Sequence, residues 1–196
     1  MPRLPALPVD RLTDDQRRLF DKITGGARAK TRAPADFLNE EGSLKGPFNA
    51  FLYAPEIGDA AQRLGELLRF NGSLPGALRE LAILTVAVHW RAQYEWWAHE
   101  KIARAEGLDD AAIEAVKIGQ APPGEEGLAI VHSFVRELLI DRRVADQTYQ
   151  AAQLLLGNEG VVELVILIGY YGLISASLNA FQVPLPEGVT PPLPED

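Results

Sequence analysis

Two glutamates and a histidine occupy positions where apolar side chains are expected. At about 100° per residue along a helix, Glu80 falls in the same stripe as Ile83 and Ala87. Glu95 lies near the centre of the apolar stripe of the following helix, and His99 is one turn further along the same face. A carboxylate in an apolar stripe is costly unless it is paired or used in chemistry. The pattern therefore indicates a polar cluster on the buried faces of two consecutive helices.

Proton transfer is the chemistry that these residue types support. Histidine changes its charge near neutral pH, and a neighbouring carboxylate makes it a usual general acid or base. An interruption of the helix near Arg91 places Glu95 in the first turn of the following helix, where the helix dipole stabilises a negative charge. A structural alternative stays open, in which Glu80 pairs with Arg79 or Arg91 and His99 is a satisfied core histidine.

The aromatic residues and the other histidines around this cluster favour packing roles. Trp96 and Trp97 flank the stripe that carries Glu95, on faces that the core of one chain does not need, although Trp96 is nearer to His99. We therefore interpret them as packing or subunit-interface residues before substrate contacts. His89 and His132 are not assigned to the cluster, and a structural role is expected for each.

Residues that start or end helices occur along almost the whole chain, and they predict an all-α fold of about seven or eight helices. Thr13 and Gln16 have the spacing of a capping box, and that helix should stop at Gly25. Ser73 is the expected cap of the helix that carries Glu80. The proline-rich end of the chain is expected to be extended and packed over a surface. The predicted helices lie within residues 13–25, 59–70, 73–90, 91–107, 109–119, 125–140, 146–157 and 161–180.

Composition excludes several classes of function. The formal net charge is −8, with no cluster of Lys and Arg to offset it, so a nucleic-acid partner is not expected. Cysteine is absent, which excludes disulfides, zinc–thiolate sites and thiol redox chemistry in this chain. Residues 161–180 are nearly long enough to span a membrane, but Glu163 interrupts them and no basic flank follows. We expect a buried or subunit-interface helix, no membrane partner and a cytoplasmic location.

The segment "LRELAILTVAVHWRAQYEWWAHEKIARAEGL" resembles the carboxymuconolactone decarboxylase family, which shares its fold with alkylhydroperoxidase D. The resemblance extends from "GPFNAFLYAPEI" through "LNAFQVPLPEG", which is most of the chain. It implies three parts: an N-terminal helical extension and loop (1–45), a family-like helical domain (46–183) and a proline-rich tail (184–196). It also implies assembly into a homotrimer or homohexamer with helices shared across the subunit contacts.

The resemblance also implies roles for individual residues. In the peroxidase branch a Cys-x-x-Cys pair occupies the positions of Ala92 and Glu95, and a glutamate and a histidine relay protons from the positions of Glu80 and His99. The dithiol cycle is therefore impossible for this chain. The decarboxylase branch, which carries a glutamate and a histidine at Glu95 and His99, is more similar. Its reaction is a cofactor-free loss of CO2 from an unsaturated lactone acid in aromatic catabolism.

For such a reaction we assign His99 as proton donor, Glu95 as its orienting group and Glu80 as a second acid or base. The partner would be a small organic acid, such as a 4-carboxymuconolactone-like lactone or a keto acid. A dianionic substrate needs a cation, and the candidate substrate-binding residues are Arg79, Arg91, Lys45 and the aromatic Trp96.

Three other functions stay open at the sequence level. Glu80, Glu95 and His99 could ligate a divalent metal ion, although the set is poor in histidine. The same scaffold could bind a ligand without catalysis. A family-level peroxidase label could also attach to this chain without the thiols that such an activity needs.

Overall fold

The computed structural model describes residues 2–26 and 37–194, and the described chain is helical. No strand occurs among these residues, and a single isolated bridge joins Leu38 and Leu44. The described residues form two compact units, each of which is treated by itself below. Unit 1 comprises Met1–Gly72 with Ser177–Pro184, and unit 2 comprises Ser73–Ala176 with Leu185–Asp196. The predicted all-α class is confirmed.

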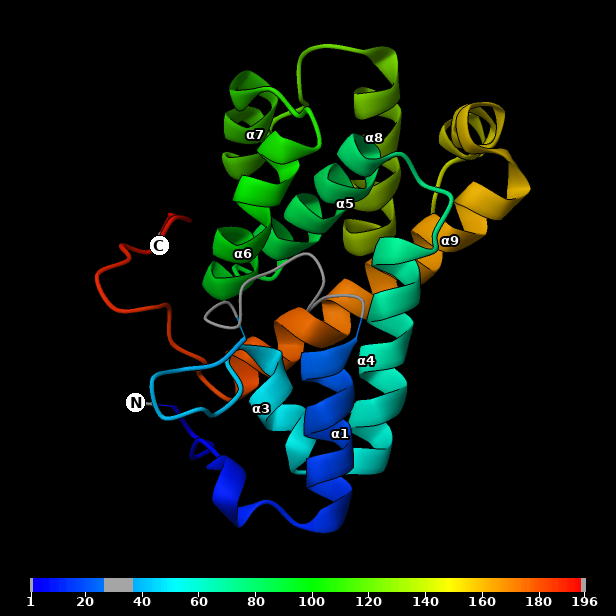
Figure 1. Cartoon of the computed structure of the whole chain (residues 1–196). Helices are drawn as coiled ribbons and strands as arrows, with labels where there is room; N and C mark the ends of the chain where they lie inside the picture. Colours follow the sequence, from blue (N-terminus) through cyan, green and yellow to red (C-terminus); the bar gives the residue numbers. More distant parts are fainter. Residues whose placement is uncertain (1, 27–36, 195–196) are drawn as a thin grey trace. The chain divides into compact units, whose positions relative to one another are not determined.

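Unit 1 is built on three helices, α1 (Asp14–Gly25), α3 (Pro47–Leu52) and α4 (Pro55–Phe70), which pack against one another (Figure 1). A short 3-10 helix, η1 (Val9–Arg11), precedes them. The predicted capping box is present at the start of α1. The Thr13 hydroxyl accepts a hydrogen bond from the Gln16 backbone, and the Gln16 side chain accepts one from the Thr13 backbone.

Unit 2 contains α5 (Gly76–His89), α6 (Gln93–Ala105), α7 (Asp110–Lys117), α8 (Glu126–Ile140) and most of α9 (Asp146–Ala180). Helix α5 is central, since it packs against α6, α7 and α8 (Figure 1). Every residue from Glu80 to Ala87 is buried. A helix that is covered all round must be apolar all round, so the burial of Glu80 in this stretch is exceptional.

The break between α5 and α6 sets the position of the site residues on α6. Arg91 adopts a left-handed conformation (φ 49°), which ends α5 and turns the chain. The backbone N–H of Ala92 then donates to the Ala87 carbonyl at 2.9 Å. Because α6 restarts at Gln93, Glu95 lies in its first turn, as predicted.

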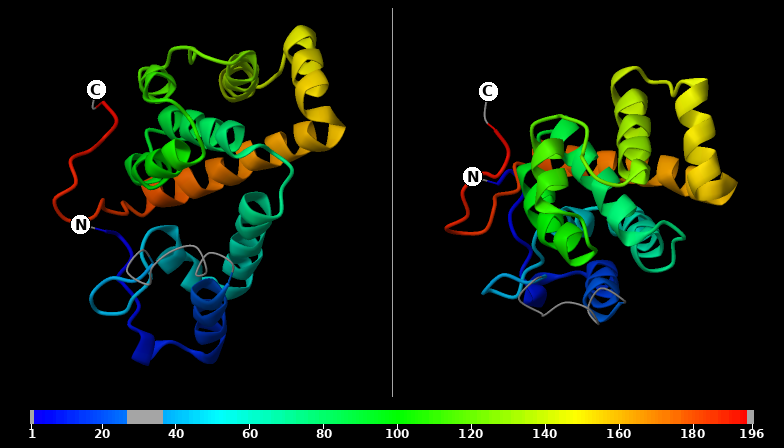
Figure 2. Two further views of the ribbon diagram at one scale, coloured as in Figure 1. Left: turned by 45° about the horizontal axis from the view of Figure 1, so that its top comes forward. Right: turned by 90° about the horizontal axis from the view of Figure 1, so that it is seen from above.

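Helix α9 consists of two helical segments separated at Gly157, whose φ of 67° and ψ of 177° are not helical. Figure 2 shows the yellow segment before the break and the orange segment after it meeting at a sharp bend. By length and composition α9 could cross a membrane, the one such helix in the described ranges. However, 50% of its most apolar window is buried inside the protein, as in the core helices of soluble proteins, so the evidence for a span is weak.

Three local predictions were wrong. Helix α4 begins at Pro55, earlier than predicted, because proline is well suited to the first position of a helix. Ser73 does not cap α5, which begins at Gly76. Its backbone N–H and its hydroxyl instead donate to Glu163 Oε2 at 2.6 and 2.7 Å. Trp96 was expected on a face that the core of its own chain does not use, but it is fully buried in that core and so takes the packing role of the two that were predicted.

The C-terminal tail is held on unit 2, as predicted, by one side chain. The Gln93 amide donates to the Leu193 carbonyl at 3.0 Å and accepts from the Leu193 backbone N–H at 2.8 Å. Leu193 is itself buried. The predicted division at residues 45 and 183 stays a prediction.

Candidate active site

Glu80 is the most deeply buried member of the predicted cluster. Its side chain has no exposed surface, yet both carboxylate oxygens are engaged. Oε2 lies 2.6 Å from His99 Nδ1, and Oε1 accepts from Arg79 Nε at 3.2 Å. Two positively charged or donor groups therefore offset the cost of burying this carboxylate.

His99 bridges Glu80 on α5 and Glu95 on its own helix. The second ring nitrogen, Nε2, lies 3.1 Å from Glu95 Oε1, one helical turn away. His99 and Glu95 are both buried. The three residues that the sequence singled out are thus joined through one imidazole, with each ring nitrogen facing a different carboxylate.

This arrangement favours the protonated form of His99. Burial acts to lower the pKa of the imidazole, but the negative charges of Glu80 and Glu95, together with their hydrogen bonds, outweigh it and raise the pKa above its ordinary value. An imidazolium has a donor on each nitrogen and suits two carboxylate acceptors. The raised pKa favours the charged, proton-donating form of His99 in a buried position.

A chain of ionic groups links this buried cluster to the surface. Besides its contact with Glu80, Arg79 donates from its terminal guanidinium nitrogen to Glu106 Oε1 at 3.1 Å. The side chain of Arg79 is 12% exposed and that of Glu106 is 41% exposed. Arg79 therefore belongs to the site, but its guanidinium is already shared between two carboxylates.

Tyr171 on α9 is a neighbour of the site that the sequence analysis missed. Its ring meets the His99 ring edge to face, with centroids 5.2 Å apart, and it packs in the same manner against Tyr170 at 5.3 Å. Both tyrosines are buried. A pair of tyrosines in an otherwise aliphatic helix was a usable signal, since a buried phenol needs a polar partner.

The other predicted substrate-binding residues lie in three different settings. Arg91 is exposed at the turn between α5 and α6, and Lys45 belongs to unit 1. Trp96 is buried, and its indole Nε1 has no hydrogen-bond partner in the described part of the chain.

The geometry gives no support to the metal hypothesis. Within residues 2–26 and 37–194, no group of three or more His, Asp or Glu side chains is arranged to hold a metal ion. The reason is visible at His99, because its two nitrogens point at two separate carboxylates. The arrangement is a hydrogen-bonded chain, in which the imidazole lies between the oxygens and does not converge with them on one point.

Comparison with known families agrees with this geometry. Residues 55–129 match the sequence profile of "CMD: Carboxymuconolactone decarboxylase family". This segment is similar to that family over less than half of the chain. It contains Glu80, Glu95 and His99, so the whole ionic cluster lies in the matched region. No curated protein matches the chain in sequence.

Solved structures of two other proteins share the fold of most of the chain. An uncharacterised peroxidase-related protein from Ralstonia eutropha JMP134, described as an alkylhydroperoxidase AhpD core, superposes with a TM-score of 0.72 at 16% identity, over 95% of this chain and 93% of its own. ATU0492 from Agrobacterium tumefaciens is a protein of unknown function that bears the name of the antioxidant defence protein AhpD. It superposes with a TM-score of 0.63 at 17% identity, over 72% of this chain and 99% of its own. The predicted AhpD-like fold is confirmed.

Proposed function

We propose that this protein is a cofactor-free lyase or isomerase that transfers a proton to a small unsaturated lactone or keto acid, with decarboxylation as the favoured reaction. The observation that carries the proposal is the buried imidazole of His99 between two carboxylates, 2.6 Å from Glu80 and 3.1 Å from Glu95. Protonated and shielded from water, such a group is a ready acid for a carbanionic intermediate. The family match supports the same class of reaction.

The reaction needs a single proton from the protein. When the bond to the substrate carboxylate breaks, CO2 leaves and the electron pair passes into the conjugated lactone or keto carbonyl. The proton on His99 Nε2 then forms the new C–H bond as the enolate collapses, and the neutral imidazole regains a proton from solvent. Because Nδ1 is held by the fully buried Glu80, Nε2 is the nitrogen that can exchange Glu95 for substrate.

The roles of the two carboxylates would then differ from those assigned from the sequence, where Glu95 was the orienting group. Glu80 makes the shorter contact and has the lower exposure, so it is the better orienting group for the ring. Glu95 lies in the first turn of α6, where the helix dipole stabilises its charge. It would hold the Nε2 proton until substrate arrives and balance the imidazolium during reprotonation.

A thiol peroxidase reaction is not an alternative for this chain. The positions that correspond to a redox cysteine pair are Ala92 and Glu95, and the sequence contains no cysteine. The names of the two structural relatives therefore do not carry over as an activity. Hydroperoxide turnover with a dithiol reductant is expected to be absent, and a coupled peroxidase assay tests this.

The test is a screen of lactone acids and β-keto acids with CO2 release as the readout. His99→Gln should reduce kcat by about 100-fold or more, because glutamine cannot donate and regain a proton and general acid catalysis supplies about 10²–10⁴-fold. Glu80→Gln and Glu95→Gln should cost less, since each weakens the orientation or the charge of His99 without removing the acid.

Glu100→Gln is the matched control for both glutamate variants. Glu100 lies on α6 next to His99 in sequence, but it pairs with Arg104 at 2.9 Å near the surface. Its replacement should leave turnover within about twofold of the parent, as surface ion pairs contribute little. Turnover by folded His99→Gln at the parental rate would show that the histidine is structural.

A further inference from the structure

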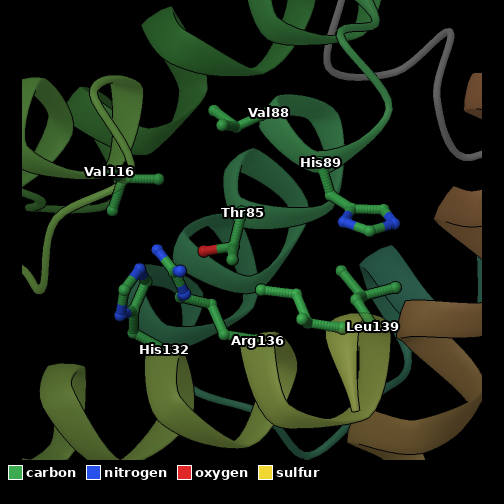
Figure 3. Close-up of a pocket in the computed structure, with 8 residues that line it drawn as sticks. Thr85, Val88, His89, Val116, His132, Arg136 and Leu139 are labelled. Carbon is green, nitrogen blue, oxygen red and sulfur yellow. The ribbon is translucent and has the colours of Figure 1, made fainter. Parts of the chain in front are cut away.

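A cavity in unit 2 lies away from the ionic cluster. Its volume is about 190 Å³, and α5, α7 and α8 form its walls (Figure 3). Counted at about 100° per residue, Thr85 and His89 lie about 140° and 180° around α5 from Glu80. The cavity therefore opens on the other side of α5. Its lining residues are Thr85, Val88, His89, Val116, His132, Arg136, Leu139 and Ile140.

The walls are mainly apolar, and Arg136 provides a positive charge among them. Its guanidinium donates from one terminal nitrogen to the Gly119 carbonyl. No carboxylate of the described chain forms an ion pair with it. Arginine can present five N–H donors in a planar fork that fits a carboxylate. A half-buried arginine that lines an apolar cavity without an acidic partner suits an anion from outside the chain.

His132 adds a second polar group to the same wall. The side chain is 3% exposed, and no hydrogen bond to its ring nitrogens is found in the described part of the chain. Figure 3 shows the ring beside the Arg136 guanidinium. His132 and Arg136 therefore place a neutral imidazole and a guanidinium side by side in one wall of the cavity, and the guanidinium has further N–H donors besides the one that binds the Gly119 carbonyl.

We propose that this cavity binds a small organic carboxylate with an apolar body of about the size of a benzene ring. The carboxylate would pair with Arg136 and accept a hydrogen bond from His132, and the body would contact Val88, Val116 and Leu139. An apolar cavity of about 150 Å³ holds benzene, so 190 Å³ accommodates a ring with one carboxylate. This site is separate from the proposed catalytic cluster and does not depend on it.

Proton linkage provides a signature of such binding. Burial and then the charge of Arg136 lower the pKa of His132 to about 4, so the empty cavity holds a neutral imidazole. The titratable or charged groups that line the cavity are His89 from α5 and His132 and Arg136 from α8, while α7 contributes only Val116. A bound carboxylate offsets the Arg136 charge and raises the pKa of His132. Affinity for the anion should therefore rise as the pH falls below neutrality.

Calorimetric titration with benzoate tests the proposal. We expect saturable binding of one molecule per chain with a dissociation constant of about 1 mM or below, the range for a ligand of about nine non-hydrogen atoms. Arg136→Gln should weaken binding by about 10- to 100-fold, the usual worth of a hydrogen bond to a charged group. Benzamide, which has the same size but no charge, should bind at least about tenfold more weakly than benzoate.

A matched pair of variants locates the binding without touching Arg136. Ile140→Trp at the exposed rim of the cavity should block binding, whereas Ile118→Trp, on an exposed isoleucine outside the lining, should not. His99→Gln should leave the affinity unchanged, because His99 lies on α6 and contacts Glu80 on the side of α5 away from the cavity. Four results would each overturn the proposal. Two concern the ligand: no saturation at benzoate concentrations about tenfold above the expected dissociation constant, or equal affinity for benzamide. Two concern the variants: loss of binding in His99→Gln, or full binding in Ile140→Trp. The rim variants decide the question even if Arg136→Gln fails to fold.

Discussion

At the scale of single residues, His99 offers the most direct prediction. Its pKa is raised because two carboxylates outweigh the cost of burial. Glu80 makes the shorter contact and is the larger of the two charge contributions. Glu80→Gln should therefore lower the pKa of His99 more than Glu95→Gln does, and Glu100→Gln should leave it unchanged. NMR titration of the histidine ring protons measures the pKa of His99 in the parent and in the three variants. Equal values in the parent and in Glu80→Gln would show that the pair does not form.

The pKa of His132 is shifted in the opposite direction, and this shift should make the folded protein less stable in acid. Its pKa of about 4 in the folded protein lies below the ordinary 6.5, so the unfolded chain binds the proton more readily. Stability is then full above pH 6.5 and is lost as the pH falls towards 4, by up to about 3 kcal/mol. His132→Gln should lack this loss. Urea unfolding between pH 4.5 and 7.5 should show a shallower acid slope for the variant, and parallel slopes would contradict the assignment.

At the scale of elements, the helices were predictable because their ends carry local signals. Thr13 with Gln16 and the break at Arg91 were read correctly, since a cap or a turn depends on nearby residues. The N-terminus of α5 was not, because Ser73 finds Glu163, which is distant in sequence. Hydroxyls can cap a helix or bind elsewhere, and only the tertiary structure decides.

The same contrast between local signals and contacts distant in sequence explains which parts of the candidate site were predicted. Glu80, Glu95 and His99 were predictable because helical spacing brings Glu95 and His99 together and marks Glu80 as buried. The contact of Tyr171 with His99 joins α9 to α6, and the tyrosine pair in the sequence does not show which side chain it meets. The cavity at Arg136 was likewise missed, because it depends on how three helices diverge.

Gly157 provides a test at the scale of one element. Its φ of 67° with ψ of 177° belongs to a region that essentially only glycine adopts. An added Cβ would meet no atom within 4 Å, so any cost of Gly157→Ala is backbone strain, about 1–3 kcal/mol. Gly169 also has open space but lies in the regular part of α9. Gly169→Ala should instead gain about 0.4–1 kcal/mol. Thermal unfolding of both variants checks this, and equal effects would contradict the role of the bend.

At the scale of the whole molecule, α9 has an exposed apolar face in addition to the face that it buries in the core. One face of the helix beyond Gly157 is buried and includes Val161, Leu164, Leu167 and Ile168. The other face is apolar but exposed, with Val162 at 59%, Val165 at 44%, Ile166 at 43% and Leu173 at 45%. A contiguous exposed stripe of this kind is typical of a surface that another protein covers.

We predict that α9 stripe residues form the contact of a homo-oligomer, which the family resemblance suggests is a trimer or hexamer. Ile166→Arg should convert the assembly to a smaller species, because a charge would be buried at the contact without a partner. The control is Ile118→Arg, the same substitution at an isoleucine that is 60% exposed and lies directly after the end of α7. Light scattering coupled to size exclusion should report an oligomer for the parent and the control at micromolar concentration. A stable monomeric parent would refute the prediction. An oligomer that Ile166→Arg leaves intact would place the contact on another surface.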